Sequence, residues 1–361
     1  MKRRRCRPLA AIAAAVLVLA GCAWSGPPGG AAAPGAASVA AAPGATPQGA
    51  APSAGGAAKA GQAGHAPLSV RVEPRQLSPR AWFVQGDAGP VSRENEGFNS
   101  NAGFVVTDQG VVVFDALGTP ALGAELLAQI RRITPLPVRV VIVSHYHADH
   151  FYGLQAFKDA GAEIWAHRKV RDYLATEAPA DRLTERRQSL APWVDAQARI
   201  VPPDRYLDGD TAFRLGGLGF RVLTVGPAHT AEDLMLLVEE EGVLFAGDLM
   251  FAGRVPFVGD ADSRSWLESV RRLVRMNPKV IVGGHGPASR DAERDLALTR
   301  DYLAFLRDAM GRAVERMQSF DEAYAATDWS RFRDLPAFEA ANRRNAYNTY
   351  LRMEQEALEG R

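Results

Sequence analysis

Three histidines and one aspartate lie within six residues, in the segment His145-Tyr-His-Ala-Asp-His150. This segment follows an apolar, β-branched run at residues 138–143, which predicts a short buried strand. Imidazole and carboxylate groups without thiolate are typical ligands of zinc, and also of iron or manganese. Because only 7 of the 361 residues are histidine, the clustering favours a metal site over a polar loop that is rich in histidine by chance.

Further residues of the same ligand types follow other predicted strands. His229 comes after the apolar run 220–225, and His285 comes after residues 280–282. Asp248 follows four apolar residues, and a buried aspartate needs a counter-charge that a metal ion would supply. Glycine stands close to each of the three, which lets backbone approach the site. Each residue alone is a weak signal, but together they predict one site at the ends of several strands.

The order and spacing of these motifs resemble those of the metallo-β-lactamase superfamily of metallohydrolases, over about residues 80 to 290. The resemblance implies two metal ions with seven ligands: His145, His147 and His229 for the first, Asp149, His150 and His285 for the second, and Asp248 bridging both. It implies divalent ions, with zinc favoured over iron and manganese. It also implies a metal-bound hydroxide as the nucleophile, oriented by Asp149.

Three further residues near predicted strands need an interpretation. Asp115 ends the apolar run 110–114 and matches the family's first motif, where an aspartate supports the ligands; the alternative is a turn former at a strand end. His167 follows the run 163–166 but matches no ligand position, so we expect a structural role. His65 lies outside the predicted strands and helices, and we expect no role for it.

The predicted substrate class depends on Asp248. True metallo-β-lactamases mostly carry cysteine or serine there, whereas an aspartate resembles the ligand set of glyoxalase-II-like thioesterases. The resemblance therefore implies hydrolysis of an ester or thioester carbonyl in a small-molecule substrate. Residues 247–266 are similar to exported metallohydrolases associated with quinoprotein dehydrogenases and sulfur oxidation. Three alternatives stay open: a metallo-β-lactamase, a mononuclear iron sulfur dioxygenase, and a non-catalytic metal-binding accessory protein.

The first 22 residues are typical of a lipoprotein signal peptide. Residues 1–7 carry five positive charges, and residues 9–20 form an apolar stretch too short to span a bilayer. The sequence Leu19-Ala-Gly-Cys22 resembles the bacterial lipobox. We expect export, lipidation of Cys22 and anchoring on the periplasmic face of a bacterial membrane, with the outer membrane favoured. The alternative is an ordinary secretory signal.

The composition after the signal peptide excludes several classes of protein. Residues 23–67 are almost entirely Ala, Gly and Pro, with Lys59 the only charge, which predicts a disordered linker. Removal of the signal peptide lowers the formal charge from +1 to −4, so no basic patch argues for nucleic acid. The only cysteines are Cys6 and Cys22, which leaves no disulfide and no thiolate ligand in the folded part.

The folded part predicts an α/β protein. We expect strands at residues 81–85, 102–107, 110–114, 138–143, 162–166, 211–215, 219–225, 233–238, 242–246 and 279–282, and helices at 120–133 and 263–276. This order at residues 68–290 fits the αββα sandwich that the resemblance implies.

Residues 291–361 predict a C-terminal helical extension. One helix face would carry Leu303, Leu306, Met310, Val314 and Met317, and a last helix would start near Pro336. Arg343, Arg344, Tyr347 and Tyr350 are the residues of this extension that could reach a pocket.

Overall fold

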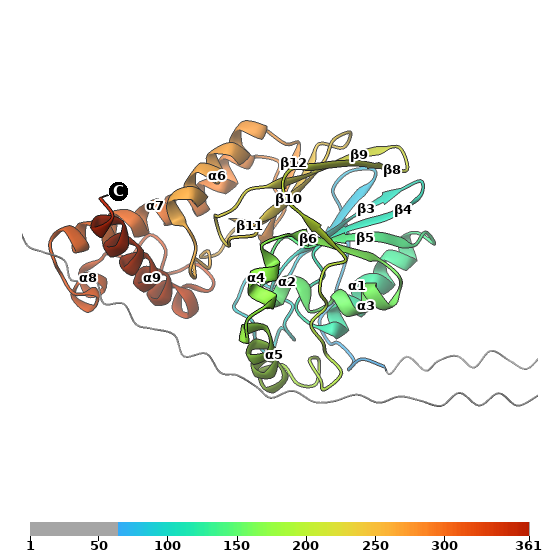
Figure 1. Ribbon diagram of the computed structural model, residues 1–361, viewed down its shortest axis with the longest axis horizontal. Coiled ribbons are helices and arrows are strands. Elements are labelled where there is room, and N and C mark those ends of the chain that lie inside the picture. Colours follow the sequence, from blue (N-terminus) through green and yellow to red (C-terminus); the bar gives the residue numbers. More distant parts are fainter. Residues whose placement is uncertain (1–63, 361) are drawn as a thin grey trace, which may run out of the picture. The chain divides into compact units, whose positions relative to one another are not determined.

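The computed structural model describes residues 64–360 (Figure 1). The predicted signal peptide, the lipidation site Cys22 and nearly all of the predicted linker lie outside the described residues. Within the described part of the chain, no helix is both long and apolar enough to cross a membrane.

Two β-sheets form the centre of the described part. The first sheet has the order β1-β2-β3-β4-β5-β6-β7, comprising β1 (Arg75–Gln76), β2 (Ala81–Val84), β3 (Ala102–Thr107), β4 (Gly110–Phe114), β5 (Val138–Ile142), β6 (Glu163–His167) and β7 (Arg205–Leu207). Strands β1 to β4 pair antiparallel, and β4 to β7 pair parallel. The second sheet has the order β12-β11-β10-β9-β8, comprising β12 (Val280–His285), β11 (Val243–Phe251), β10 (Leu234–Val238), β9 (Leu218–Thr224) and β8 (Thr211–Leu215). Only β11 and β12 pair parallel in it.

Helices connect and cover these sheets. They are α1 (Pro120–Ile133), α2 (Ala148–Phe151), α3 (Leu154–Asp159), α4 (Val170–Leu174), α5 (Ala178–Ser189), α6 (Ser263–Met276), α7 (Ala292–Glu315), α8 (Phe320–Ala326) and α9 (Phe338–Leu358). Local sequence sets the starts of the longer ones. The Thr119 side chain accepts a hydrogen bond from the Leu122 amide at the start of α1, and Asp262 does the same for Ser265 at the start of α6. Both helices therefore begin where the sequence predicts.

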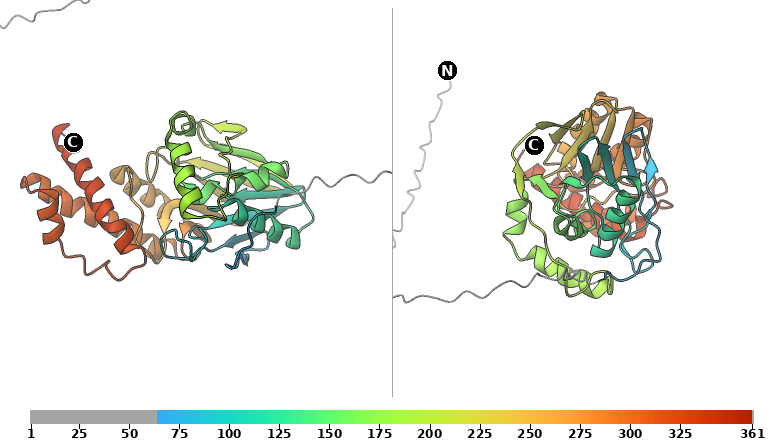
Figure 2. Two further views of the ribbon diagram at one scale, coloured as in Figure 1. Left: turned by 90° about the horizontal axis from the view of Figure 1, so that it is seen from below. Right: turned by 90° about the vertical axis from the view of Figure 1, so that its right-hand side faces the viewer.

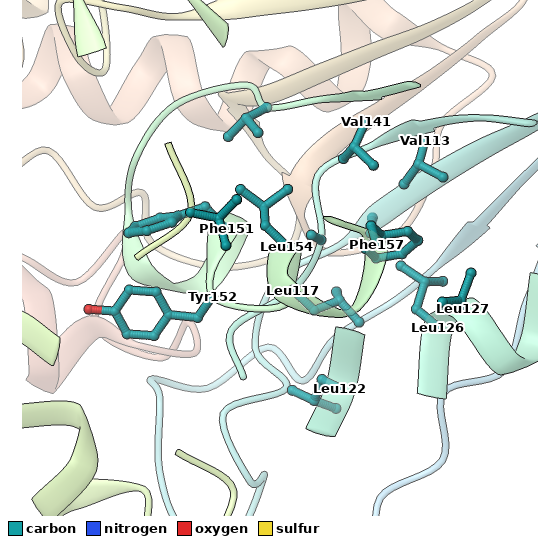
Figure 3. Close-up of a cluster of buried hydrophobic side chains, with 14 of the residues drawn as sticks. Val113, Leu117, Leu122, Leu126, Leu127, Val141, Phe151, Tyr152, Leu154 and Phe157 are labelled. Carbon is teal, nitrogen blue, oxygen red and sulfur yellow. The ribbon is translucent and has the colours of Figure 1, made fainter. Parts of the chain in front are cut away.

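Strand β4 shows why strands of the first sheet are uninterrupted apolar runs in the sequence. Val111 and Val113 pack into the cluster under α1 and α3, whereas Val112 and Phe114 face the second sheet. Across that interface the ring of Phe114 lies 5.9 Å from the ring of Phe245. Figure 3 shows side chains of α1 and α3 converging on Val113 and Val141. Both faces of β4 are buried, so alternate polar residues have no place in it.

The outer face of the second sheet is covered by the later helices. Leu244 and Ala246 of β11 share one apolar cluster with Trp266 of α6 and Leu303 of α7. The Trp266 indole also donates a hydrogen bond to the Leu249 carbonyl at 3.1 Å. The layers are thus helix, sheet, sheet, helix, and the α8 and α9 helices extend from the α7 side (Figures 1 and 2). The predicted αββα sandwich with additional C-terminal helices is confirmed.

Several details differ from the predicted elements. Strand β11 continues to Phe251 instead of ending at residue 246, because a bulge at Gly247, where φ is +54°, lets the chain resume pairing with β12. Met317 is 92% exposed, since α7 ends at Glu315 and Met317 leaves the helix with φ +53°. Pro336 precedes the α9 cap Ala337 instead of occupying the first turn. The short strands β1 and β7 carry too few apolar residues to be recognised.

Candidate metal centre

All seven predicted ligands meet at one edge of the two sheets. His145 and His147 follow β5, and Asp149 and His150 lie in the short helix α2. The other three come from the second sheet: His229 from the loop between β9 and β10, Asp248 from β11, and His285 from the end of β12. The parallel pairing of β11 with β12 brings Phe251 opposite His285 and places both strands' site residues at the same edge.

The side chains form two groups. Ligand atoms of His145, His147, His229 and Asp248 lie within 4.8 Å of one another, and so do those of Asp149, His150 and His285. His167 belongs to neither group; its Nδ1 accepts a hydrogen bond from the Lys169 amide at 3.3 Å. The resemblance implies the same grouping of the histidines and Asp149, with Asp248 shared between the two groups.

Asp248 faces both groups with different oxygens. Its Oδ2 lies 3.2 Å from His229 Nε2 and 3.8 Å from His145 Nε2. Its Oδ1 lies 3.1 Å from His150 Nε2 and 3.4 Å from His285 Nε2. The two oxygens of this one carboxylate therefore face different groups, Oδ2 the first and Oδ1 the second.

Several buried nitrogen and oxygen atoms of the site lack hydrogen-bond partners within residues 64–360. They are His145 Nε2, His150 Nε2, His229 Nδ1 and Asp248 Oδ1. Buried polar groups in proteins are nearly always hydrogen-bonded, and each unpaired one costs about 1–3 kcal/mol. Three of them, His145 Nε2, His150 Nε2 and Asp248 Oδ1, are atoms of a type that binds metals, and they lie where the two groups face one another. The donor set and its unpaired atoms thus fit divalent metal ions.

Hydrogen bonds behind the ligands fix which ring nitrogen is free. His150 Nδ1 donates to Asp115 Oδ2 at 2.9 Å, which leaves Nε2 facing Asp248. Asp115 also accepts from the Ser144 amide and hydroxyl at 2.7 and 2.8 Å. His145 Nδ1 lies 2.9 Å from the Ser144 hydroxyl oxygen and can donate to it, since that hydroxyl's proton goes to Asp115. Asp115 thus lies behind ligands of both groups, and such partners orient metal-binding imidazoles.

A loop before β3 supports the second group, and the sequence did not indicate it. Asn99 Nδ2 donates to Asp149 Oδ2 at 3.0 Å, and the Asn99 carbonyl accepts from His285 Nδ1 at 2.6 Å. The next asparagine, Asn101, donates to the Gly283 and Gly286 carbonyls at 2.9 and 2.8 Å, which holds the loop against β12. The only sequence signal was the polar run Asn99-Ser-Asn101 beside a strand, which is common in turns.

A second unpredicted residue positions His229. Both oxygens of the buried Asp233 accept from Thr230, from the amide at 2.8 Å and the hydroxyl at 2.7 Å. This closes the loop that carries His229. The rings of Trp266 and Phe251, at 5.2 and 5.9 Å, then surround the imidazole.

Burial and neighbouring charges set the protonation of the site before metal binds. Burial lowers the pKa of His229 to about 4 and that of His147 to about 3. These rings are therefore neutral near pH 7, which is the form that binds metals. Burial would raise the pKa of Asp248, but the neighbouring positive charge, that of His285 and then of His150, holds it well below its usual value. The carboxylate is thus ionised and available as a ligand.

A cavity of about 570 Å³ opens over the two groups. His147, Asp149 and His285 form part of its lining, and Asp149 is the most open of the acidic ligands, with 23% of its side chain exposed. Of the four C-terminal residues considered from the sequence, only Arg344 lines it.

The remaining three have other contacts. Arg343 pairs with Asp321 at 2.6 Å, the Tyr347 ring packs on Phe320 at 5.0 Å, and the Tyr350 hydroxyl donates to the Gln318 carbonyl.

One known protein family matches the part of the chain that carries this site. The pattern of the metallo-beta-lactamase superfamily matches residues 95–285, which is more than half of the chain and includes all seven residues. The chain belongs to the metallo-beta-lactamase superfamily. Members of this superfamily are metal-dependent hydrolases, and this chain carries the cluster of histidine and aspartate that could bind their metals.

Individual relatives differ in the reactions that their names describe. The linear primary-alkylsulfatase of Pseudomonas sp. (strain ATCC 19151) is 24% identical over 251 residues, which cover 59% of this chain and 47% of that protein. The metallo-beta-lactamase type 2 of Elizabethkingia meningoseptica is 25% identical over 194 residues, covering 52% of this chain and 69% of that protein. The match thus spans only about half the length of the alkylsulfatase.

Solved structures agree on the fold. A metallo-beta-lactamase family protein from Thermus thermophilus matches with a TM-score of 0.59 and 20% identity, covering 79% of this chain and 95% of that one. An inverting sec-alkylsulfatase from Pseudomonas sp. matches with a TM-score of 0.61 and 18% identity, covering 78% of this chain and 50% of that one. At these identities the likeness establishes the shared fold alone.

Proposed function

We propose that the protein is a binuclear metal-dependent hydrolase that acts on an ester or thioester carbonyl. The position of Asp248 is the observation that carries this proposal, because its Oδ2 faces the first group and its Oδ1 faces the second. One tetrahedral ion cannot use seven ligands. The proposal therefore assigns His145, His147 and His229 to one ion, Asp149, His150 and His285 to another, and Asp248 to both.

Bound divalent ions would lower the pKa of water toward about 7 and polarise a carbonyl oxygen. The protein's own residues would orient the reactants. Asp149 lines the cavity, and its Oδ2 is held by the Asn99 amide group, so it is placed to accept a proton from attacking water. The carboxylate of Asp248 would set the separation of the ions.

Zinc is our proposed metal, with iron and manganese as the alternatives, because the donor atoms are imidazole nitrogens and carboxylate oxygens. A mononuclear iron dioxygenase would leave the second group of ligands unused. A non-catalytic accessory protein would need no open cavity beside its metal. Both alternatives are therefore less well supported than a hydrolase.

A second candidate is hydrolysis of sulfate esters. It is favoured by four arginines in the lining of the cavity and by the similarity to an alkylsulfatase. A metallo-β-lactamase activity is a weaker candidate, because the carboxylate at position 248 is not what the dedicated lactamases mostly carry.

Two measurements test the proposal. Elemental analysis of the zinc-loaded protein should give close to two equivalents per chain, and a value that stays near one after loading contradicts the binuclear site. The same protein should hydrolyse carboxylic esters or thioesters in a panel that also contains alkyl sulfates, β-lactams, lactones and phosphodiesters. Turnover of alkyl sulfates or β-lactams alone would replace the ester proposal with the corresponding alternative.

A further inference from the structure

Residues 67–70, at the end of the predicted linker, form a strap across the loop that supports the second metal group. The Ser69 amide lies 3.0 Å from both carboxylate oxygens of Glu96, and the Ser69 hydroxyl donates to Glu96 Oε1. The Val70 amide lies 3.4 Å from Glu96 Oε2. Glu96 is in the loop between β2 and β3, three residues before Asn99. The N-terminal strap therefore holds the same loop that contacts the metal ligands.

Glu96 is a buried carboxylate that depends on this strap. Only 3% of the residue is exposed, and it has no ion pair within residues 64–360. In this part of the chain, all hydrogen bonds to its carboxylate come from Ser69 and Val70. A buried charge without partners is costly. Release of the strap would therefore drive the Glu96 carboxylate toward water.

The backbone around Glu96 is held in an unfavourable conformation. Glu96 has φ +54°, in the left-handed region that a residue other than glycine adopts only where its surroundings hold it. The next residue, Gly97, has φ +78°, and a Cβ there would lie 2.9 Å from Thr119 and 3.0 Å from Leu190. The hydrogen bonds to the strap offset the cost at Glu96. Without them, the loop would lose a contact that keeps this conformation.

Only two residues separate Glu96 from the nearest contact with the ligands. Phe98 is buried in the apolar cluster under α1, and Asn99 follows it directly. Asn99 donates to Asp149 at 3.0 Å and accepts from His285 at 2.6 Å. Neither of these hydrogen bonds involves the first metal group. A shift at Glu96 would therefore reach two ligands of the second group.

We propose that Glu96 is a positioning residue for the second metal ion, which acts through Asn99 and is held in place by the N-terminal strap. This inference rests on the two-ion centre of the proposed function. It adds a link between the point where the folded part begins and the metal site. The link predicts that changes in the strap weaken the binding of the second ion and leave the first ion unaffected.

Zinc titrations of the full chain, in competition with a chelating dye, test this link. Glu96→Gln replaces one acceptor oxygen by an amide group that cannot accept the hydrogen bonds of the strap. We expect the second ion to bind about ten-fold more weakly, the lower end of the effect of partners behind metal ligands. Ser69→Ala loses only the hydroxyl bond and should have a smaller effect in the same direction. Ser69→Thr keeps the hydroxyl and should bind zinc like the wild type.

Three background variants assign the effect to an ion and to a path. His147→Ala removes a ligand of the first group and His285→Ala removes one of the second, so each leaves the other group complete. Glu96→Gln should weaken zinc binding in the His147→Ala background but not in the His285→Ala background. In the Asn99→Ala background its effect should largely disappear, because changes along one hydrogen-bond network are not additive.

Glu356→Gln is the matched control for a general loss of stability. Glu356 is also a buried carboxylate, but it lies in α9 and accepts from Arg264 and Arg307 at 2.6 and 2.7 Å. Both variants should unfold at lower urea concentrations, but only Glu96→Gln should change zinc affinity. Hydrogen exchange of the metal-free protein gives a readout that does not depend on zinc. Glu96→Gln should speed exchange at residues 98–101, and Glu356→Gln should not.

The outcomes separate this inference from the proposed function. Two bound ions with unchanged affinity for the second in Glu96→Gln would overturn the positioning role and leave the two-ion centre standing. Equal weakening of both ions, or the same weakening in Glu356→Gln, would show that the strap only stabilises the fold, and would also overturn it. A wild-type protein that binds only one zinc ion would contradict the two-ion centre, and both proposals would then be wrong.

Discussion

At the scale of single residues, the proposed two-ion site depends on Asp248. Its oxygens lie 3.2 Å from His229 and 3.1 Å from His150, which belong to different groups. A shared negative charge also reduces the repulsion between two cations that would lie close together. Asp248→Asn keeps the shape but removes that charge. We expect metal affinity to fall by about 10–100-fold or more, most strongly for the second ion, in competition titrations with a chelating dye.

His167→Ala is the control for this prediction. His167 is buried at a strand end like the ligands, but within residues 64–360 its ring bonds only to the nearby Lys169 amide. Two zinc equivalents should remain in this variant. Normal metal content in Asp248→Asn, or loss of metal in His167→Ala, would mean that the ligands are assigned to the wrong residues.

Asp115 acts through the ligands without being one of them. It accepts from His150 Nδ1 and from both the amide and the hydroxyl of Ser144, in a left-handed conformation with φ +63°. Asn tolerates this conformation as well as Asp does, so Asp115→Asn isolates the loss of charge and of one acceptor oxygen. We expect about 10–100-fold weaker metal binding with an unchanged fold, checked by zinc titration and circular dichroism. Zinc affinity equal to that of the wild type would reduce Asp115 to a turn former.

At the scale of elements, close contact between β11 and β12 shapes the site. A Cβ on Gly284 of β12 would lie 1.9 Å from Asp248 Oδ1. Glycine at this position therefore lets the backbone of one strand lie directly against the carboxylate of the next. The bulge at Gly247 has the complementary role, because it turns the Asp248 side chain toward the ligands while β11 continues.

The C-terminal helices are joined to α6 by a group of ion pairs around Glu356 of α9. This carboxylate is 9% exposed and pairs with Arg307 of α7 at 2.7 Å and with Arg264 of α6 at 2.6 Å. Loss of the charge leaves Arg307, with 14% of its side chain exposed, without this partner. We expect Glu356→Gln to lower the free energy of unfolding by about 1–3 kcal/mol, measured by urea denaturation. Asp321→Asn, which breaks an exposed pair with Arg343, should cost less than about 1 kcal/mol.

The effect of Glu356→Gln should also depend on pH. The hydrogen bond from Arg307 lowers the pKa of Glu356 from its usual 4.5. The stabilisation by the carboxylate is therefore complete above pH 4.5 and is lost as the pH falls through the lowered pKa. The stability difference between wild type and Glu356→Gln should shrink in acid. A difference that is constant from neutral to acidic pH would show that the ion pairs do not stabilise the fold.

At the scale of the whole molecule, we propose export and attachment to a membrane by a lipid on Cys22. The charged first residues, the short apolar stretch and the sequence Leu19-Ala-Gly-Cys22 support this proposal. Cys22→Ser should abolish incorporation of labelled lipid and shift the protein from the membrane fraction to the soluble fraction, or leave the precursor uncleaved. Unchanged labelling and fractionation of that variant would contradict lipidation at Cys22.

The sequence by itself determined the types of the ligands and the order in which they occur. The His145–His150 segment is local, and the strands before His229, Asp248 and His285 are visible as short apolar runs, so the family and the αββα fold follow from neighbouring residues. Local patterns also predicted the limits of α1 and α6, because their caps lie beside them in the chain.

Only the tertiary structure decided how distant segments meet at the centre. Asn99 contacts Asp149 and His285 across 50 and 186 residues of sequence, so no local pattern could reveal it. The cavity likewise receives Arg344 rather than Arg343, because adjacent residues of a helix point about 100° apart and only packing against Phe257 selects one. Convergence of this kind is set by long-range packing, whereas ligand type and strand pattern are properties of the chain itself.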